Sequence, residues 1–202
     1  MLKFLAKTIS VVLHPLFLSF YATLLAVLLM PYQFAGINIE GGVKIYLLVF
    51  INTIFLPLIF LFLLKKLDFI NSFYLRTNKE RIIPFIGVSV FYTWAFISVK
   101  NTDLPPIIYQ ILLGATISLY TLFFINMFVK ASMHSTGMGA FLILMLHLLL
   151  VSPFNILLLF CLCVLCIGLL GSARLYLGEH KPFDIYFGYI IGMISQIIAF
   201  KF

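Results

Sequence analysis

The chain has 202 residues, of which 64% are hydrophobic and 9% are charged, and its formal net charge is +7. With a mean hydropathy of +1.20, a 23 kDa globule would lack the polar surface that a soluble fold needs, so we exclude one. The apolar content also excludes intrinsic disorder, and we expect membrane lipid, not nucleic acid, around this surface. The cysteines share one apolar run, which excludes a disulfide scaffold and predicts packing residues in a helix: Cys161, Cys163 and Cys166.

Seven apolar runs are suited to cross a bilayer as helices, because a hydrocarbon core of roughly 30 Å needs about 20 residues. Charged residues, prolines or glycines interrupt the sequence between these runs. In chain order, the predicted helices cover residues 8–31, 43–64, 82–99, 106–129, 136–152, 154–172 and 184–200.

Three of these runs carry further signals. The first follows two lysines, as a signal peptide would, but it is too long and no cleavage site closes it, so we expect a retained helix. The fifth run is short and shares the turn Ser152-Pro153 with the sixth, which predicts a helical hairpin. Gly188 and Gly192 in the last run form a G-x-x-x-G pattern, which is typical of close helix packing.

The runs predict an all-α fold, a polytopic bundle of six or seven membrane-spanning helices in one integral membrane domain over residues 1–202. Because successive crossings alternate in direction, the N-terminus and the loops 65–81, 130–137 and 173–183 belong to one membrane face. Ten of the thirteen Lys and Arg residues fall on that face: Lys3, Lys7, Lys65, Lys66, Arg76, Lys79, Arg81, Lys130, Arg174 and Lys181.

This charge asymmetry has two interpretations. The positive-inside rule would make the basic face cytoplasmic, and it accounts well for the lysines beside the first two helices. The other six cations lie in or beside polar segments that suggest chemistry, and without them the count is four against three, so charge leaves the orientation open. We expect an integral multi-pass protein of the bacterial cytoplasmic (inner) membrane.

Three polar segments on the basic face contain more than solvated charge. They read Arg-Thr-Asn-Lys-Glu-Arg-Ile-Ile-Pro-Phe at 76–85, Lys-Ala-Ser-Met-His-Ser-Thr-Gly-Met-Gly at 130–139, and Ser-Ala-Arg-Leu-Tyr-Leu-Gly-Glu-His-Lys-Pro-Phe-Asp at 172–184. Together they bring two histidines, several cations, a serine and an aspartate to one face. Cations can neutralise the oxygens of a transferring phosphoryl group, one imidazole can attack phosphorus, and another can protonate the leaving oxygen.

His180 and Asp184 carry the most specific signal. Pro182 favours a helix start directly after the histidine, and the four-residue step lets the carboxylate reach one imidazole nitrogen. Such a contact fixes the tautomer and leaves the other nitrogen nucleophilic. The alternative is that Asp184 only complements the helix dipole and His180 is an interfacial histidine.

His134 lies near Lys130 and Ser132, at a helix start that contains Ser135, Thr136 and a glycine. Backbone N–H groups at such a start, with the hydroxyl and the ammonium group, would form an anion-binding cradle. The alternative is that these small residues are helix caps and packing contacts.

Four further polar residues within or beside the apolar runs need an explanation. Arg174 and Arg81 would each cost roughly 2.5–3.5 kcal/mol at mid-membrane, so they belong at the interface or in a wet cavity, next to an anion. Lipid headgroups could supply that anion without any function. His14, beside a proline in the first run, and His147, toward the opposite face, are interpreted as packing or interface residues.

The three segments together resemble the type-2 phosphatidic acid phosphatase and vanadium haloperoxidase superfamily. That family's last motif is Ser-Arg, five residues, His, three residues, Asp; here Arg174, His180 and Asp184 keep the spacing, with Ala173 in the serine position. The intervening Leu-Tyr-Leu-Gly is also typical of the family. The middle motif, Pro-Ser-Gly-His, reads Ala-Ser-Met-His and ends at His134.

The first family motif, Lys, six residues, Arg-Pro, is altered in this chain. Pro84 keeps the proline, Ile83 stands where the arginine is expected, and Arg76 takes the lysine position. The resemblance therefore implies a divergent subgroup in which Arg81 and Lys130 supply the missing positive charge.

The resemblance covers a phosphatase-like core at about 76–188 and implies a role for each matched residue. His180 would form a phosphohistidine, Asp184 would orient it, and His134 would protonate the leaving alcohol, with no metal ion or other cofactor. Four residues would hold the phosphoryl oxygens, with two more cations as candidates: Ser132, Arg174, Lys130 and Arg81, then Lys79 and Arg76.

The predicted function is that of a membrane lipid phosphatase that hydrolyses a phosphomonoester or pyrophosphate of an amphiphilic substrate. Phosphatidic acid, phosphatidylglycerol phosphate, a polyprenyl pyrophosphate and a lipid A phosphate are all candidates. The altered first motif keeps a second hypothesis open, a protein that binds or transports a lipid phosphate or another anion without cleaving it. A third is a structural membrane subunit.

Overall fold

The computed structural model describes residues 1–70 and 78–202, with the side chains of 78–81 outside the described part. Within these ranges every regular element is a helix. The elements are α1 (Leu2–Val12), α2 (Pro15–Leu29), α3 (Pro31–Phe34), α4 (Ile39–Phe50), the π-helical turn η1 (Ile51–Phe55), α5 (Leu56–Lys66), α6 (Asn78–Lys100), α7 (Pro106–Ile125), α8 (Met133–Val151), α9 (Leu157–Tyr176) and α10 (Pro182–Ala199).

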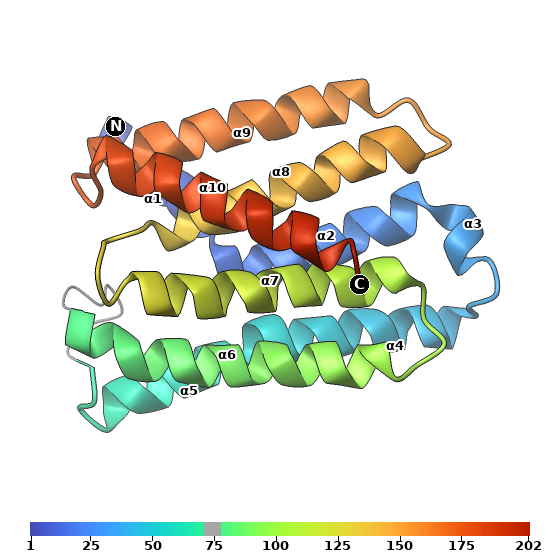
Figure 1. Ribbon diagram of the computed structural model, residues 1–202, viewed down its shortest axis with the longest axis horizontal. Coiled ribbons are helices and arrows are strands. Elements are labelled where there is room, and N and C mark those ends of the chain that lie inside the picture. The colour runs from blue at the N-terminus through green and yellow to red at the C-terminus, as the bar shows by residue number, and fades with distance from the viewer. Residues whose placement is uncertain (71–77) are drawn as a thin grey trace.

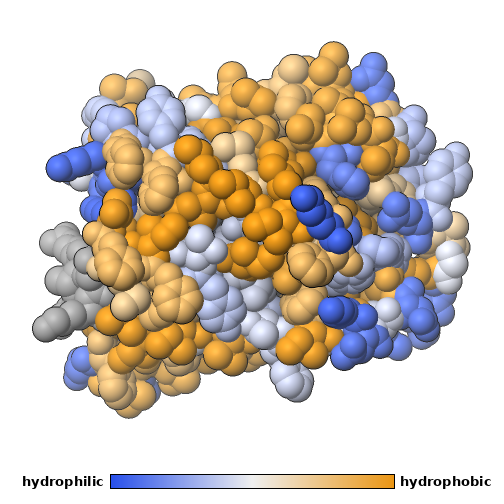
Figure 2. Space-filling model, in the orientation of Figure 1, coloured by the Kyte–Doolittle hydropathy of each residue, from blue (hydrophilic) through white to orange (hydrophobic). Residues whose placement is uncertain are grey.

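The predicted all-α membrane fold is confirmed. Among the described residues, six helices are long and apolar enough to cross a membrane, or seven if the bent pair α1 and α2 forms one span. Figure 2 shows apolar side chains over most of the face in view, with hydrophilic residues mainly toward the two ends of the molecule. Such an exterior is suited to lipid, because a surface this apolar would aggregate in water.

The first predicted helix, residues 8–31, is wrong as a single element. The chain forms α1 and α2, whose axes differ by 58°. Pro15 opens α2, because it has no N–H to continue the α1 ladder, and His14 caps the new helix through Nδ1, which accepts the N–H of Leu16 at 3.3 Å. The break between the two helices therefore lies at His14, and it places the imidazole of this residue at one end of the bundle.

The second predicted helix is continuous but contains a wider turn. Residues Ile39–Lys66 form a 28-residue span through α4, η1 and α5. Pro57 cannot donate to the carbonyl of Thr53, and the hydroxyl of Tyr92 approaches that carbonyl at 3.5 Å. A π-helical turn at this position accommodates the missing backbone bond.

Proline also marks the start of the last helix. α10 begins at Pro182, which confirms the helix start expected directly after His180. α8 begins at Met133, three residues before the predicted start at 136, because Ser132 takes the N-cap position. His134 is therefore inside the first turn of α8.

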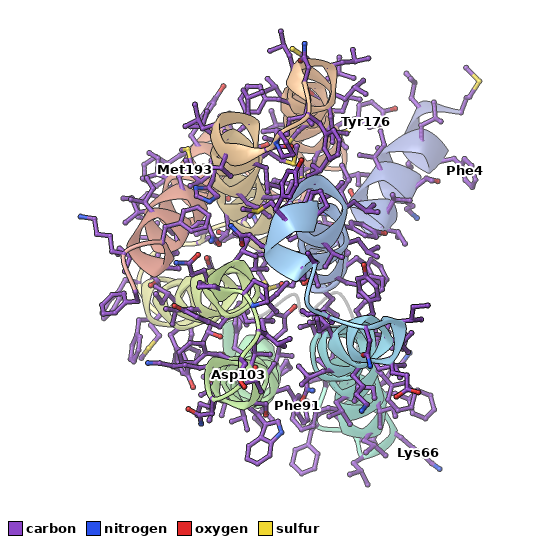
Figure 3. All side chains as sticks on the ribbon, turned by 90° about the vertical axis from the view of Figure 1, so that its right-hand side faces the viewer. Phe4, Lys66, Phe91, Asp103, Tyr176 and Met193 are labelled. Atoms are coloured by element: carbon purple, nitrogen blue, oxygen red, sulfur yellow. The ribbon has the colours of Figure 1, made fainter. Side chains whose placement is uncertain are left out.

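The helices run side by side, so their linkers gather at two ends (Figure 1). We call "site end" the end that carries the N-terminus, the α7–α8 linker at 126–132 and the α9–α10 linker at 177–181. We call "far end" the end that carries α3, the α6–α7 linker at 101–105 and the α8–α9 linker at 152–156. In Figure 3, seen from the far end, α1 lies at the edge of the bundle and Phe4 points away from it.

Close packing of α8 against α10 sets the geometry of the site end. A Cβ atom at Gly192 would collide with the backbone carbonyl of Thr136, and one at Gly188 would come within 2.7 Å of the carbonyl of Ser132. The two glycines thus let the helix backbones touch, as the G-x-x-x-G pattern predicts. Their separation of four residues keeps both contacts on one face of α10.

Candidate active site

Two of the three polar segments are joined directly at the site end. The N–H of Ser132, before α8, donates to the carbonyl of Asp184 in the first turn of α10 at 3.1 Å. Nζ of Lys130 donates to the carbonyl of Glu179 in the α9–α10 linker at 2.8 Å. Segments about 50 residues apart in sequence thus form one structure, with both predicted histidines at the same end of the bundle.

His180 and Asp184 form the predicted pair. Nδ1 of His180 and Oδ2 of Asp184 are 3.3 Å apart, and their side chains are only 8% and 9% exposed. The same carboxylate oxygen accepts the N–H of Lys181 at 3.0 Å, which holds the acid against the start of α10. Because an ionised carboxylate can only accept, His180 carries its proton on Nδ1 and has a free electron pair on Nε2.

A left-handed glycine shapes the loop that presents His180. Gly178 has a φ of +69° directly after the end of α9, a conformation that glycine adopts without a steric penalty. The turn brings Glu179 back toward α9, where its Oε2 lies 3.9 Å from Nη2 of Arg174. The side chain of Arg174 is 13% exposed, so this cation is largely buried at the base of the loop that carries His180.

The surroundings of His180 favour its neutral form. Burial, with the positive charges of Arg174 and Lys130, lowers the pKa of His180 to about 4, although Asp184 opposes the change. A neutral imidazole has a free electron pair on Nε2 at physiological pH. The same two cations that disfavour imidazolium would favour a bound phosphoryl group.

His134 contacts the last turn of α1, just before the break between α1 and α2. Nε2 of His134 lies 3.1 Å from the carbonyl of Ser10, and because a carbonyl can only accept, Nε2 carries the proton. Nδ1 is then the nitrogen available for a second partner. His134 is 8% exposed and lies two residues after Ser132, whose N–H donates to the carbonyl of Asp184, so both predicted histidines lie near this backbone contact.

Ser132 has a structural contact that the site prediction did not include. Its side chain is fully buried, and Oγ accepts the N–H of Ser135 at 3.3 Å as the cap of α8. The N–H of Thr136 donates to the Ser132 carbonyl. The expected cradle of free N–H groups at 135–137 is therefore wrong for Ser135 and Thr136, and a phosphate contact of Ser132 stays a prediction.

His14 is the site residue that sequence reasoning missed. Its ring lies edge-on to that of His134, with centroids 5.0 Å apart and planes at 87°. Gly137 permits this approach, because a Cβ there would come within 2.8 Å of Leu18 on α2. The prediction treated His14 as a packing or interface residue of an unbroken helix; the available signal was Pro15, which requires a helix start directly after a capping residue.

The cations of the altered first motif lie outside the described side chains. Arg76 falls within 71–77, outside the described residues, and the side chains of Lys79 and Arg81 are likewise not described. The backbone of α6 begins at Asn78. The proposed contacts of Arg76, Lys79 and Arg81 with phosphate therefore stay predictions.

Within the described part of the chain, no group of three His, Cys, Asp or Glu side chains is arranged to hold a metal ion. Comparison with protein families, curated proteins and solved structures finds no match to this chain. The resemblance to the phosphatase superfamily therefore stays a prediction, and the functional argument depends on the geometry of the site end.

Proposed function

We propose that this protein is a metal-independent phosphatase of the bacterial inner membrane, which hydrolyses a phosphomonoester or pyrophosphate of an amphiphilic substrate through a phosphohistidine. The observation that carries the proposal is the buried His180–Asp184 contact of 3.3 Å, which a backbone hydrogen bond from Ser132 to Asp184 joins to the His134 segment. An oriented neutral imidazole next to cations is the arrangement that nucleophilic attack on phosphorus needs.

In the first step, Nε2 of His180 donates its electron pair to phosphorus. The P–N bond forms while the bond from phosphorus to the leaving oxygen breaks. The negative charge of the bound phosphate favours the imidazolium form of His134, which gives its Nδ1 proton to that oxygen. The carbonyl of Ser10 keeps the other nitrogen of His134 protonated. Asp184 stabilises the positive charge that develops on His180.

In the second step, a water molecule attacks the phosphohistidine. Nδ1 of His134, now neutral, accepts a proton from the water, the P–N bond breaks, and inorganic phosphate leaves with His180 restored. Arg174 and Lys130 hold the phosphoryl oxygens in both steps, and Arg81 is a further candidate. Their charges offset the negative charge that spreads over the oxygens in the transition state.

An amphiphilic substrate fits the position of these residues at the end of a membrane bundle. A headgroup phosphate can reach the site end at the interface while its hydrocarbon stays within the membrane. Phosphatidic acid, phosphatidylglycerol phosphate, polyprenyl pyrophosphate and lipid A phosphate all present this chemistry.

Trapping the intermediate tests the proposal. Purified protein is mixed with a lipid phosphate that carries a radioactive phosphorus, quenched rapidly, and examined for protein-bound label that is stable in base and labile in acid, as phosphohistidine is. We expect label on the wild type and none on His180→Ala, with phosphate released only by the wild type. If both proteins bind the lipid and neither releases phosphate, the chain is a binding or transport protein and the proposal fails.

Vanadate gives an independent check, because it mimics five-coordinate phosphorus. We expect it to inhibit phosphate release competitively with the lipid substrate. Full activity in millimolar vanadate would contradict the mechanism.

A further inference from the structure

A narrow cavity runs from the site end into the bundle, and we call it the slot. It lies mainly among α2, α6, α7 and α8, with one lining residue each from α5 and α10, and its volume is about 150 Å³. His14 and Met133 line its outer end, while Leu144 and Gln196 line its inner end. The slot therefore begins beside His134, which follows Met133 in sequence and contacts His14.

The slot is long compared with its volume. Its lining on α8 extends from Met133 to Leu144, which corresponds to about 16 Å along the helix axis at 1.5 Å per residue. A compact cavity of about 150 Å³ holds a benzene-sized molecule. The lining therefore follows several helical turns, which suits a single linear chain better than a compact or branched group.

The walls of the slot are mainly apolar. Leu18, Val88, Leu119 and Phe141 are typical of its lining, and few polar groups interrupt them. An apolar cavity of this kind favours hydrocarbon over water, because water needs several polar partners. Since the surrounding helices are suited to span the membrane, hydrocarbon is also the main component of their environment.

We propose that the slot holds one hydrocarbon chain of the phosphorylated substrate while its phosphate lies against His180 and Arg174. This inference rests on the proposed phosphatase function and specifies its substrate class, a phosphate carried at the end of at least one linear alkyl or isoprenoid chain. A diacyl lipid would place one chain in the slot and leave the other in the bilayer.

The proposal predicts a limited dependence on chain length. Each methylene group that enters apolar surroundings contributes ~0.8 kcal/mol, which is about fourfold in kcat/KM. The increase stops when the chain reaches the inner end of the slot near Leu144. If the gain in kcat/KM came only from partitioning of the substrate into detergent, a substitution inside the slot would not alter its dependence on chain length.

The experiment compares linear alkyl phosphates from butyl to hexadecyl, in a fixed excess of detergent, on three proteins. Ala140→Trp fills the middle of the slot, where Ala140 is part of the lining. Leu146→Trp places the same bulky group on the same helix at a residue that is 41% exposed. We expect the ratio of kcat/KM for hexadecyl phosphate to that for butyl phosphate to fall sharply in Ala140→Trp, and Leu146→Trp to keep the wild-type ratio. An unchanged chain-length gain in folded Ala140→Trp would overturn the slot.

A binding measurement on the wild type separates this inference from the proposed function. An alkyl phosphate with a photoreactive diazirine at the end of its chain is bound, irradiated, and located by peptide mass spectrometry. We expect labelling at Phe141 or Leu144, with loss of label when unmodified dodecyl phosphate competes. Labelling there without phosphate release would support the slot and reject the phosphatase, whereas labelling confined to exposed residues such as Leu146 would reject the slot even in an active enzyme.

Discussion

The two ends of the bundle contain similar residue types but arrange them differently. At the site end, His180 contacts Asp184, and His134 contacts His14 and the carbonyl of Ser10. At the far end, His147 stacks on Phe200, with ring centroids 4.5 Å apart, and Nζ of Lys100 lies 5.5 Å from the centre of the Phe96 ring. At the site end the two histidines contact other polar groups, whereas His147 and Lys100 at the far end lie against aromatic rings.

Both ends contain histidines and cations, so the presence of these residues does not identify a candidate site. The contacts among the polar groups do. A ring contact with phenylalanine does not fix the tautomer of a histidine, while a carboxylate at hydrogen-bond distance does so. The sequence interpretation of His147 as a packing or interface residue agrees with its ring contact. Matched substitutions at the two ends test whether the contrast has functional meaning.

The largest difference in activity is expected between substitutions of His180 at the site end and His147 at the far end. His180→Gln should lower kcat/KM for a lipid phosphate by at least about 1,000-fold, because it removes the proposed nucleophile. His147→Gln should leave it within about twofold of the wild type. Phosphate release by the two purified variants, with a thermal melt to check folding, measures this contrast; equal losses would show that the site end has no special role.

The two aspartates provide the next comparison. Asp184→Asn should reduce kcat by roughly 1,000- to 10,000-fold, because the amide cannot hold the Nδ1–H tautomer in the same way. Asp103→Asn at the far end should have little effect. The pH profile adds a direction: Asp184 raises the pKa of His180, so any residual activity in Asp184→Asn should extend to lower pH than in the wild type.

Substitutions of a cation at each end, Arg174 and Lys100, are expected to differ in kcat/KM in the same direction but by a smaller factor. Arg174→Lys keeps the charge and loses the planar fork, and we expect about a 100-fold loss in kcat/KM. Lys100→Met should change it by less than about twofold. A loss for Arg174→Lys that appeared only in protein yield, with normal kinetics in the folded fraction, would assign Arg174 to stability.

His14 tests whether the helix break belongs to the site. His14→Asn retains a side-chain acceptor for the start of α2, so it separates the cap from the ring contact with His134. As a positioning residue, His14 should contribute about 10- to 100-fold to kcat, and its loss should move the basic limb of the pH profile. A purely structural role predicts a uniform decrease at all pH values.

The smallest effect concerns Lys130. Its charge helps to lower the pKa of His180 to about 4, so Lys130→Met should raise that pKa toward 6.5. Imidazolium is not a nucleophile, and activity should therefore decline at a higher pH on the acid side than in the wild type. Lys130→Arg should keep the wild-type limb, and we expect rates above that limb to change by less than about tenfold. Identical acid limbs in all three proteins would contradict the assignment of that limb to His180.

Local sequence rules determined much of this protein. Long apolar runs require helices in lipid, because backbone groups must be satisfied internally, and prolines mark where those helices start. The parity of the crossings placed the 130–137 and 173–183 loops at one end. The four-residue step from His180 to Asp184 predicted their contact correctly, since it depends mainly on the start of one helix.

Only the tertiary structure decided which groups from separate helices touch. The broken first helix brings His14 and the carbonyl of Ser10 to His134, across more than 100 residues of sequence. Ser132 caps α8, while its contact with phosphate stays a prediction, and the slot is lined by residues of six helices. These outcomes depend on how closely helix surfaces fit, through atoms such as those around Gly137 and Gly192, and no local periodicity specifies that fit.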